Sequence, residues 1–404
     1  MTWSSPHSAK RLPRSAFATL VFVGFLAPAS RLSAQAERRA TGTVSPIVQS
    51  WSFADAVPLD TRRVSSARQI AVPFSLDLQV NLNWTASVTG AAFSSQIEST
   101  DENTNATSSS LSGLTDVRVR LTGRLRGDAL QATFGANVPV GPVGLSLAEN
   151  DVLRTVAAPA LGAAVSVPGT GLGGTVGLIS AYTVNEWAVA VGASYEQRGT
   201  YAPLEVTLTG ATSTTELVPG GAVHLSFGAD GLLGNHRLTI GAVGDFYGTD
   251  QLQFAQGARR DSADYQLGPA VLVSAQLAIA NPRIRDFTLR VTNRYRTAFS
   301  DAAGNAVIGS SGNYFDAGIS GLLGGPNRIA LALGADVRQQ SGLPVDDGFV
   351  GASLSAVGLS AGIAIPQAHI EWRPTVTAVL GTLTTNRVET PMRSLSVGLT
   401  MSFR

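Results

Sequence analysis

The chain has 404 residues, of which 44% are hydrophobic and only 14% are charged. It contains no cysteine, which excludes disulfide bonds and thiolate metal sites. With 29 basic and 28 acidic residues the chain is nearly neutral, so no nucleic-acid partner is expected.

The N-terminus has the features of a secretory signal peptide. A basic region that includes Arg14 is followed by an apolar core over residues 16–26 and by a small-x-small cleavage site that ends at Ala36. The core is shorter than the roughly 20 apolar residues that a membrane-spanning helix needs. We therefore expect residues 1–36 to be a signal peptide and the mature chain to be exported.

Residues 37–73 do not alternate cleanly between apolar and polar positions. Pro46 and Pro73 interrupt regular structure, and Trp51 and Phe53 are the only aromatic residues in the segment. Two interpretations are open, a periplasmic tail or a small plug folded into the lumen of a barrel.

The segment 74–88 alternates strictly, with an apolar residue at every even position and a polar residue at every odd position. Only a β-strand with one apolar and one polar face uses this pattern. Strands of soluble proteins usually have about 5–6 residues, whereas a tilted strand that crosses a bilayer needs roughly 9–11. The segment therefore predicts a transmembrane β-barrel.

Similar alternation recurs along the chain and predicts an all-β fold, a transmembrane antiparallel β-barrel of about 14 strands over residues 74–404. The predicted strands are 74–88, 115–126, 129–140, 172–182, 185–198, 220–229, 235–248, 264–280, 285–298, 313–322, 327–338, 349–362, 368–381 and 393–403. Their connections are long and short in turn, as in outer-membrane barrels with long extracellular loops and short periplasmic turns. We expect the bacterial outer membrane as the location.

Two of the long connections differ in composition. Residues 98–112 are almost wholly polar and cannot form a core. Residues 141–171 contain several leucines and valines, which is too apolar for a loop in water. We expect this second connection to fold over or into the mouth of the barrel.

The lumen is predicted to contain two rows of arginine side chains on opposite strands. If the apolar positions face lipid, the residues between them face inward. The inward arginines are Arg118, Arg120, Arg124, Arg126, Arg290, Arg294 and Arg296. They either form ion pairs that brace a plugged lumen or line a path that attracts carboxylates and other anions. If residues 37–73 are a plug, its expected contacts are Trp51, Phe53, Asp55 and Asp60.

His224 and Ser226 point the same way on a predicted strand, as a base and a nucleophile would. The pair resembles the His-x-Ser arrangement of outer-membrane lipid hydrolases. However, Val223, Leu225 and Phe227 appear on the lipid face, which sends the pair into the lumen as polar lining. The mature chain has few histidines and no ligand spacing among them, so neither a metal site nor a cofactor is expected.

The predicted architecture resembles the long-chain fatty-acid transporter family of outer-membrane barrels, which includes aromatic-hydrocarbon uptake channels. That resemblance implies fourteen strands and an N-terminal hatch. The segments 113–117 (GLTDV) and 135–139 (GANVP) are also similar to outer-membrane proteins of phenol-degradation pathways. Alternation up to Phe403 resembles the signal that the barrel-assembly machinery reads.

We therefore expect a non-enzymatic, porin-like channel for passive uptake of a small hydrophobic or amphipathic molecule. One alternative is a sealed structural or adhesive surface barrel, and another is a lipid hydrolase. The expected partners are outer-membrane lipid, the barrel-assembly machinery and a small hydrophobic or anionic amphipathic ligand.

Overall fold

A computed structural model divides the chain into the units Met1–Arg38 and Arg39–Arg404. It describes residues 40–403 apart from residues 60–61, 101–104, 126–128, 159–160, 209–210, 257–258, 302, 308–309, 326–327, 343–352 and 386–387. The predicted signal peptide, residues 1–36, lies outside the described residues.

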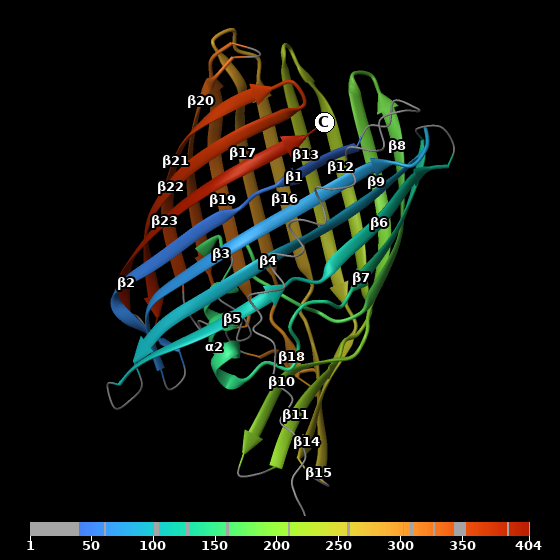
Figure 1. The fold of residues 1–404 in the computed structure, drawn as a ribbon. Helices are drawn as coiled ribbons and strands as arrows, with labels where there is room; N and C mark the ends of the chain where they lie inside the picture. Colours follow the sequence, from blue (N-terminus) through green and yellow to red (C-terminus); the bar gives the residue numbers. More distant parts are fainter. Residues whose placement is uncertain are drawn as a thin grey trace, which may run out of the picture. The chain divides into compact units, whose positions relative to one another are not determined.

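The described unit is a β-barrel with a few strands beyond one rim (Figure 1). The barrel strands are β1 (Ala40–Val44), β2 (Ile47–Leu59), β3 (Arg62–Gln79), β4 (Trp84–Thr100), β5 (Ala106–Leu114), β6 (Val117–Arg124), β7 (Leu130–Val138), β8 (Gly173–Val184), β9 (Trp187–Arg198), β12 (Ala222–Leu233), β13 (His236–Tyr247), β16 (Ala270–Ile279), β17 (Ile284–Arg296), β19 (Gly312–Leu323), β20 (Ala330–Ser341), β21 (Ser353–Gln367), β22 (Ile370–Thr385) and β23 (Val388–Phe403). The strands beyond the rim are β10 (Tyr201–Leu208), β11 (Ala211–Val218), β14 (Thr249–Gln256), β15 (Arg259–Gln266) and β18 (Ser300–Asp301). A helix, α2 (Leu147–Val156), follows β7. None of the described helical residues form a helix long and apolar enough to cross a membrane.

The barrel has 16 strand positions and is closed and antiparallel. Strands β1 and β2 lie end to end and together occupy one position in the wall. Strands β5 and β6 occupy another position in the same way. Closure occurs where β1 and β2 pair with β3 on one side and with β23 on the other. The predicted all-β antiparallel barrel is confirmed, and its strand number is close to the predicted value of about 14.

The interpretation of residues 37–73 as a tail or plug is wrong for the described part of that segment. Residues 40–44 and 47–59 form the first wall position, and residues 62–73 belong to β3. Pro46 separates β1 from β2, and its carbonyl accepts a hydrogen bond from the Leu399 N–H at 2.9 Å. Proline is tolerated at such an interruption of a strand because the missing N–H leaves no ladder bond unmade.

The segment 74–88 is a hairpin rather than one strand. It contains the end of β3, a turn at residues 80–83 and the start of β4. The Asn81 side-chain oxygen accepts hydrogen bonds from the N–H groups of Asn83 and Trp84, at 2.8 and 3.0 Å. Leu78 pairs with Ala86 across the hairpin, so even-numbered positions face outward in both strands. The alternation therefore continues through the turn unchanged.

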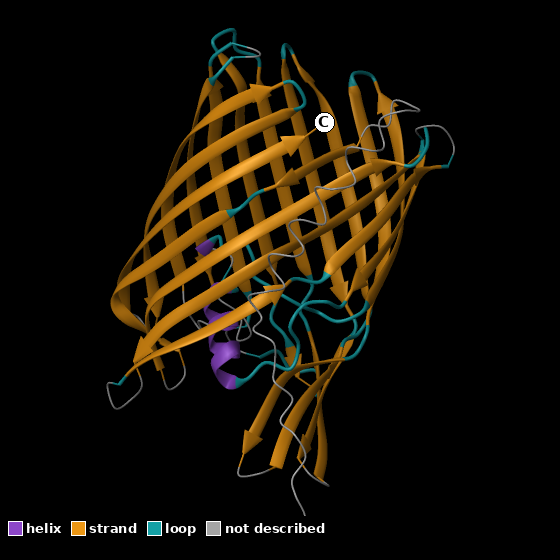
Figure 2. Cartoon of the chain, viewed as in Figure 1, coloured by secondary structure: helices purple, strands orange, loops and turns teal. Residues whose placement is uncertain are grey.

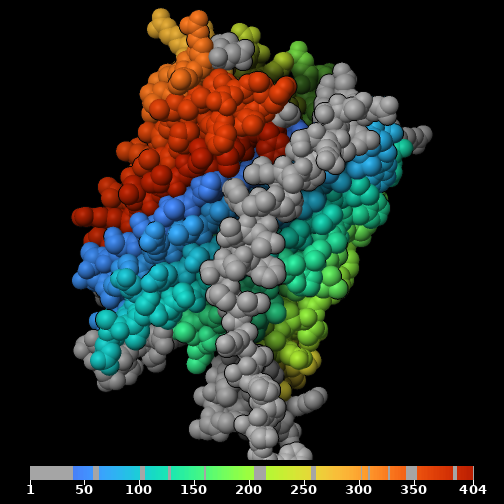
Figure 3. Space-filling view, in the orientation of Figure 1, coloured from blue at the N-terminus to red at the C-terminus, as the bar shows by residue number. Residues whose placement is uncertain are grey.

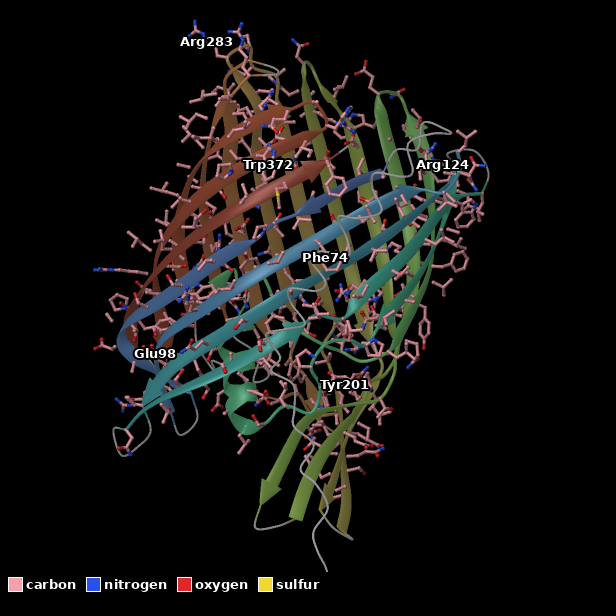
Figure 4. The ribbon with its side chains drawn as sticks, viewed as in Figure 1. Phe74, Glu98, Arg124, Tyr201, Arg283 and Trp372 are labelled. Carbon is pink, nitrogen blue, oxygen red and sulfur yellow. The ribbon has the colours of Figure 1, made fainter. Side chains whose placement is uncertain are left out.

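Short turns and the end of β23 lie at one rim, called the short-turn rim, and the longer connections lie at the other, called the long-loop rim (Figure 1). The predicted succession of long and short connections is therefore present. Figure 4 shows Arg124 and Arg283 at the short-turn rim and Glu98 at the opposite end. In outer-membrane barrels the short turns face the periplasm.

The outer face carries an apolar belt with aromatic residues at its edges. On β9, Trp187 and Tyr195 face outward eight positions apart, and on β17 the same spacing separates Phe287 from Tyr295. Eight residues of strand span about 26 Å, which after tilting matches a membrane band of about 25 Å. Trp84 near the short-turn rim covers Gly123 on β6 and stacks on Phe134, with ring centroids 6.4 Å apart.

On β4, the polarity of the inner and outer faces reverses toward the long-loop rim, although each position keeps its side. Near the turn, Ala86 and Val88 share the outward face. Farther along, Phe93 and Ile97 point inward and are buried, while Gln96 and Glu98 are exposed outside. This end of the wall therefore has an apolar inside and a polar outside, like a soluble protein.

The strands beyond the long-loop rim continue the barrel strands β9, β12, β13, β16 and β17. Asp250 is buried at this junction, where its carboxylate accepts the Gly220 N–H at 2.6 Å and lies 3.9 Å from the Arg198 guanidinium. Burial raises the pKa of Asp250, and these two contacts partly offset that shift.

The apolar belt is tested by placing a charge on each face of β16. Val273 is exposed on the outside, and Ser274 points into the lumen. Val273→Arg should lower the free energy of unfolding in lipid by about 2–4 kcal/mol, whereas Ser274→Arg should cost less. Urea unfolding in liposomes measures both, and equal losses would contradict the assignment of the faces.

The orientation is tested with single cysteines, since the chain has none. Ala263→Cys, exposed on β15, should react with an impermeant maleimide on intact cells. Leu82→Cys, in the turn between β3 and β4, should react only after the outer membrane is opened. The reverse labelling would show that the short turns face outward.

Candidate functional site

The candidate site is the lumen, which is narrowed by residues 139–172, called the constriction segment. The wall strand β7 ends at Val138, and the chain turns inward (Figure 2). Ser146 and Glu149 form a capping box that starts α2, with the Glu149 carboxylate accepting the Ser146 N–H at 3.0 Å. Val152 and Val156 on the helix are buried. The predicted folding of residues 141–171 into the mouth is confirmed.

Two glutamine side chains of the wall hold the constriction segment. On β2, the Gln49 amide donates to the Gly162 carbonyl at 3.0 Å and accepts the Ala164 N–H at 2.7 Å. On β3, the Gln69 amide donates to the Val165 carbonyl at 2.8 Å and accepts the Val165 N–H at 2.9 Å. Each amide satisfies one backbone donor and one acceptor, as a neighbouring strand would.

Apolar contacts complete this anchorage. Trp51 is 1% exposed, and its indole N–H donates to the Leu161 carbonyl at 3.1 Å. Trp51 and Phe53 belong to one buried cluster with Val152 of α2. These two aromatic residues were expected within a plug. They belong instead to the wall and contact a plug formed by the constriction segment. Of the other expected contacts, Asp55 is exposed and Asp60 lies outside the described residues.

Asp116 fixes the base of the constriction segment. It lies in the break between β5 and β6 and is 8% exposed. Its carboxylate accepts the Asn137 amide at 2.8 Å, the Gly141 N–H at 2.9 Å and the Thr170 N–H at 2.7 Å. One side chain therefore joins both ends of the segment to the wall.

The structure places the two arginine rows inside the lumen, as their strand parity predicts. On β6, Val119 and Leu121 are exposed outside, which leaves the alternate positions inward. On β17, Leu289 and Val291 face outward in the same way. The inward residues are Arg118, Arg120, Arg124, Arg290, Arg294 and Arg296, and Arg126 lies outside the described residues. Strands β6 and β17 lie seven wall positions apart in a barrel of sixteen, so the two arginine rows lie nearly opposite each other across the lumen.

Arg290 of β17 belongs to an ion-pair network with β19 and β20. Its guanidinium lies 3.3 Å from the Asp316 carboxylate, which is also 3.8 Å from Arg338. Arg338 in turn contacts the Asp336 carboxylate at 2.7 Å. Farther along β17, Arg296 lies over the Phe299 ring, 4.8 Å from its centroid.

A cavity of about 340 Å³ lies between this network and the constriction segment. Its walls come from Arg290, Tyr314 and Arg338 on one side and Gly162 on the other. Gly162 has a φ of +65° and contacts Arg338, so a side chain there would be strained and would clash. The cavity is therefore lined partly by charged side chains and partly by backbone.

Two arginines of β6 differ from Arg290 of β17 in their surroundings. Arg118 and Arg120 form no ion pair with a described residue, and both side chains are exposed to the lumen. Asp77 nearby accepts a hydrogen bond from Ser87, the residue paired with Arg120. Arg290 is thus held by an ion pair, whereas Arg118 and Arg120 are solvated.

His224 and Ser226 also face the lumen. The His224 Nδ1 atom lies 2.8 Å from the Asp245 carboxylate, and Nε2 lies 3.6 Å from Glu196. Among the described contacts, no hydrogen bond joins His224 to Ser226. The imidazole is oriented between two carboxylates and is not directed at the hydroxyl. Within the described residues, no group of three or more His, Asp or Glu side chains is arranged to hold a metal.

Sequence reasoning missed Gln49, Gln69 and Asp116 as functional positions. A glutamine on a barrel strand is ordinary lumen lining, so its partner cannot be identified without the fold. Asp116 had a weak signal, because it interrupts a run of serines and apolar residues just before the arginine row.

No protein-family model and no curated protein matches the sequence. Solved structures similar to the chain include the toluene transporter TodX of Pseudomonas putida, at 9% identity and a TM-score of 0.41, covering 92% of this chain and 91% of that one. CymD, a monoaromatic hydrocarbon channel, has 11% identity and a TM-score of 0.37, covering 94% and 92%. OprB of Pseudomonas putida has 10% identity and a TM-score of 0.40, covering 90% and 92%.

The glutamine anchorage is tested with Gln69→Leu. The substitution leaves the buried Val165 N–H and C=O without partners, at about 1–3 kcal/mol for each group. We expect a lower free energy of unfolding and a higher single-channel conductance in planar bilayers. Gln96→Leu, on the exposed outer face of β4, is the matched control. If both variants behave alike, the anchorage does not hold the segment.

Proposed function

We propose that the protein is a bacterial outer-membrane channel for passive uptake of a small hydrophobic or amphipathic molecule. The observation that carries this proposal is the cavity of about 340 Å³ between the constriction segment and the ion-pair network. This volume lies within the range of roughly 300–1,000 Å³ that small-ligand sites have, and Arg290, Tyr314 and Arg338 offer polar groups to a ligand. A wide water-filled pore would not need such a lining.

The chemistry of the lumen favours an amphipathic solute with an anionic group. Arg118 and Arg120 have no carboxylate partner among the described residues and can attract anions. Guanidinium groups bind carboxylates through two parallel hydrogen bonds. At the long-loop end, Phe93, Ile97 and Leu111 are buried against the constriction segment, so the arginines are the lumen groups that a solute would contact.

Uptake is tested by liposome swelling with the purified full chain. Benzoate and benzyl alcohol should permeate faster than arabinose, because the constriction excludes a fully polar solute of similar size. Equal rates for all three would indicate an unselective pore, and no swelling would indicate a sealed barrel. The sealed barrel is the second candidate, favoured by the burial of Trp51 and the glutamine contacts to the constriction segment.

The arginine row is tested with Arg118→Gln combined with Arg120→Gln. Loss of two solvated positive charges should lower the anion-to-cation permeability ratio severalfold. Reversal potentials in a salt gradient measure this ratio. Arg393→Gln, on the outer face of β23, should leave it unchanged. An unchanged ratio in the double variant would mean that this row does not line the path.

The protein is proposed to have no enzymatic activity. A nucleophilic mechanism at His224 would require its imidazole to accept the proton of Ser226. The imidazole instead lies between Asp245 and Glu196. Unchanged phospholipid after long incubation with the reconstituted protein would support this assignment, and fatty-acid release that Ser226→Ala abolishes would contradict it.

A further inference from the structure

An apolar groove of about 630 Å³ crosses the outer wall of the barrel from β17 to β22. It lies outside the lumen, because its ridges are formed by side chains exposed on the outer face. Those ridges are Ile319, Leu333, Leu359 and Val376. Figure 3 shows neighbouring parts of this wall, with β21 to β23 in red.

The groove follows from residue size at paired positions. Leu333 of β20 pairs with Gly321 on one side and with Ala361 on the other, so each large side chain stands beside a small one. At its β17 end, the ladder shifts register between Arg285 and Thr288. Phe287 lies within this irregularity and lines the groove.

The height of the groove places it in the leaflet near the short turns. Ile284, which lines it, is the first residue of β17, and Phe287 belongs to the aromatic edge of the belt at that rim. The groove therefore faces the depth at which phospholipid chains begin below their headgroups. An apolar occupant with a polar end at the rim fits this position.

Two arginines stand at the rim beside the groove. Arg283 is exposed immediately before Ile284 (Figure 4). Arg328 is exposed in the turn between β19 and β20. Neither forms an ion pair with a described residue. The nearby Asp286 carboxylate lies 3.7 Å from the Arg285 guanidinium and is occupied by it. Arginine is well suited to phosphate because its guanidinium offers several donors in a fixed plane.

We propose that this groove binds one phospholipid of the periplasmic leaflet. An acyl chain lies along the groove, and Arg283 and Arg328 bind the headgroup phosphate. Anionic headgroups are favoured because a zwitterionic headgroup carries its own cation, which the two guanidiniums repel, whereas an anionic headgroup carries only the phosphate charge. This lipid site does not depend on the proposed channel function.

The test is native mass spectrometry of the full chain incubated with dioleoylphosphatidylglycerol or dioleoylphosphatidylcholine. The wild-type protein should retain one phosphatidylglycerol at low lipid ratio and retain phosphatidylcholine more weakly. Ala361→Trp fills the groove and should reduce lipid retention at least about tenfold, the equivalent of roughly 1.4 kcal/mol. Ala242→Trp, at an outward position of β13 away from the groove, should retain lipid as the wild type does.

A second variant leaves the wall packing intact. Arg283→Gln with Arg328→Gln should remove the preference for phosphatidylglycerol and keep the weaker binding of phosphatidylcholine. Arg393→Gln, toward the other rim, is the matched control.

The proposal is overturned if the wild type retains no lipid, if Ala361→Trp binds as well as Ala242→Trp, or if the double arginine variant keeps the preference. It is also overturned if the wild type forms a dimer or trimer that Ala361→Trp dissociates. That result would assign the groove to a second copy of the chain.

Discussion

Closure of the sheet is the constraint on which the rest of the structure depends. In hydrocarbon, each backbone N–H and C=O without a partner costs several kcal/mol, so a membrane sheet must have no free edge. Here the edge of β23 is covered by β1 and β2, which also pair with β3. The first described residues of the chain are therefore part of the wall because the last strand needs a neighbour.

The sequence was sufficient to predict the barrel where lipid faces one side of a strand, as at β6 and β17. There the alternation of arginine with valine and leucine located both the wall and the inward residues. The sequence did not reveal the turn at residues 80–83. Leu78 and Ala86 pair with each other across this turn, so the alternation of apolar and polar residues continues through it. The sequence also failed at Trp51 and Phe53. These residues face a protein core inside the barrel, so their strand lacks the pattern that lipid imposes.

The reversal of face polarity along β4 explains why the strand that contains Trp51 and Phe53 was not predicted. It also explains why the constriction segment is needed. Beyond the apolar belt, the outside of the wall meets water and carries residues such as Gln96, while Phe93 and Ile97 turn inward. An apolar inner wall in an aqueous mouth must be covered. The constriction segment supplies that cover. Its apolar composition could be recognised in the sequence, but its contacts with Gln49 and Gln69 depend on strands that are distant in the chain.

The constriction segment divides the lumen into surfaces of different chemistry. Toward β2 and β3 it is held by neutral amides and apolar side chains. Toward β20 it presents Gly162 to Arg338, whose charge is shared by Asp316 and Asp336. Gly162 can approach this network closely because it has no side chain. The cavity that remains is therefore lined by the polar backbone of Gly162 and by the guanidinium groups of Arg290 and Arg338, which offer hydrogen-bond donors to an anionic group.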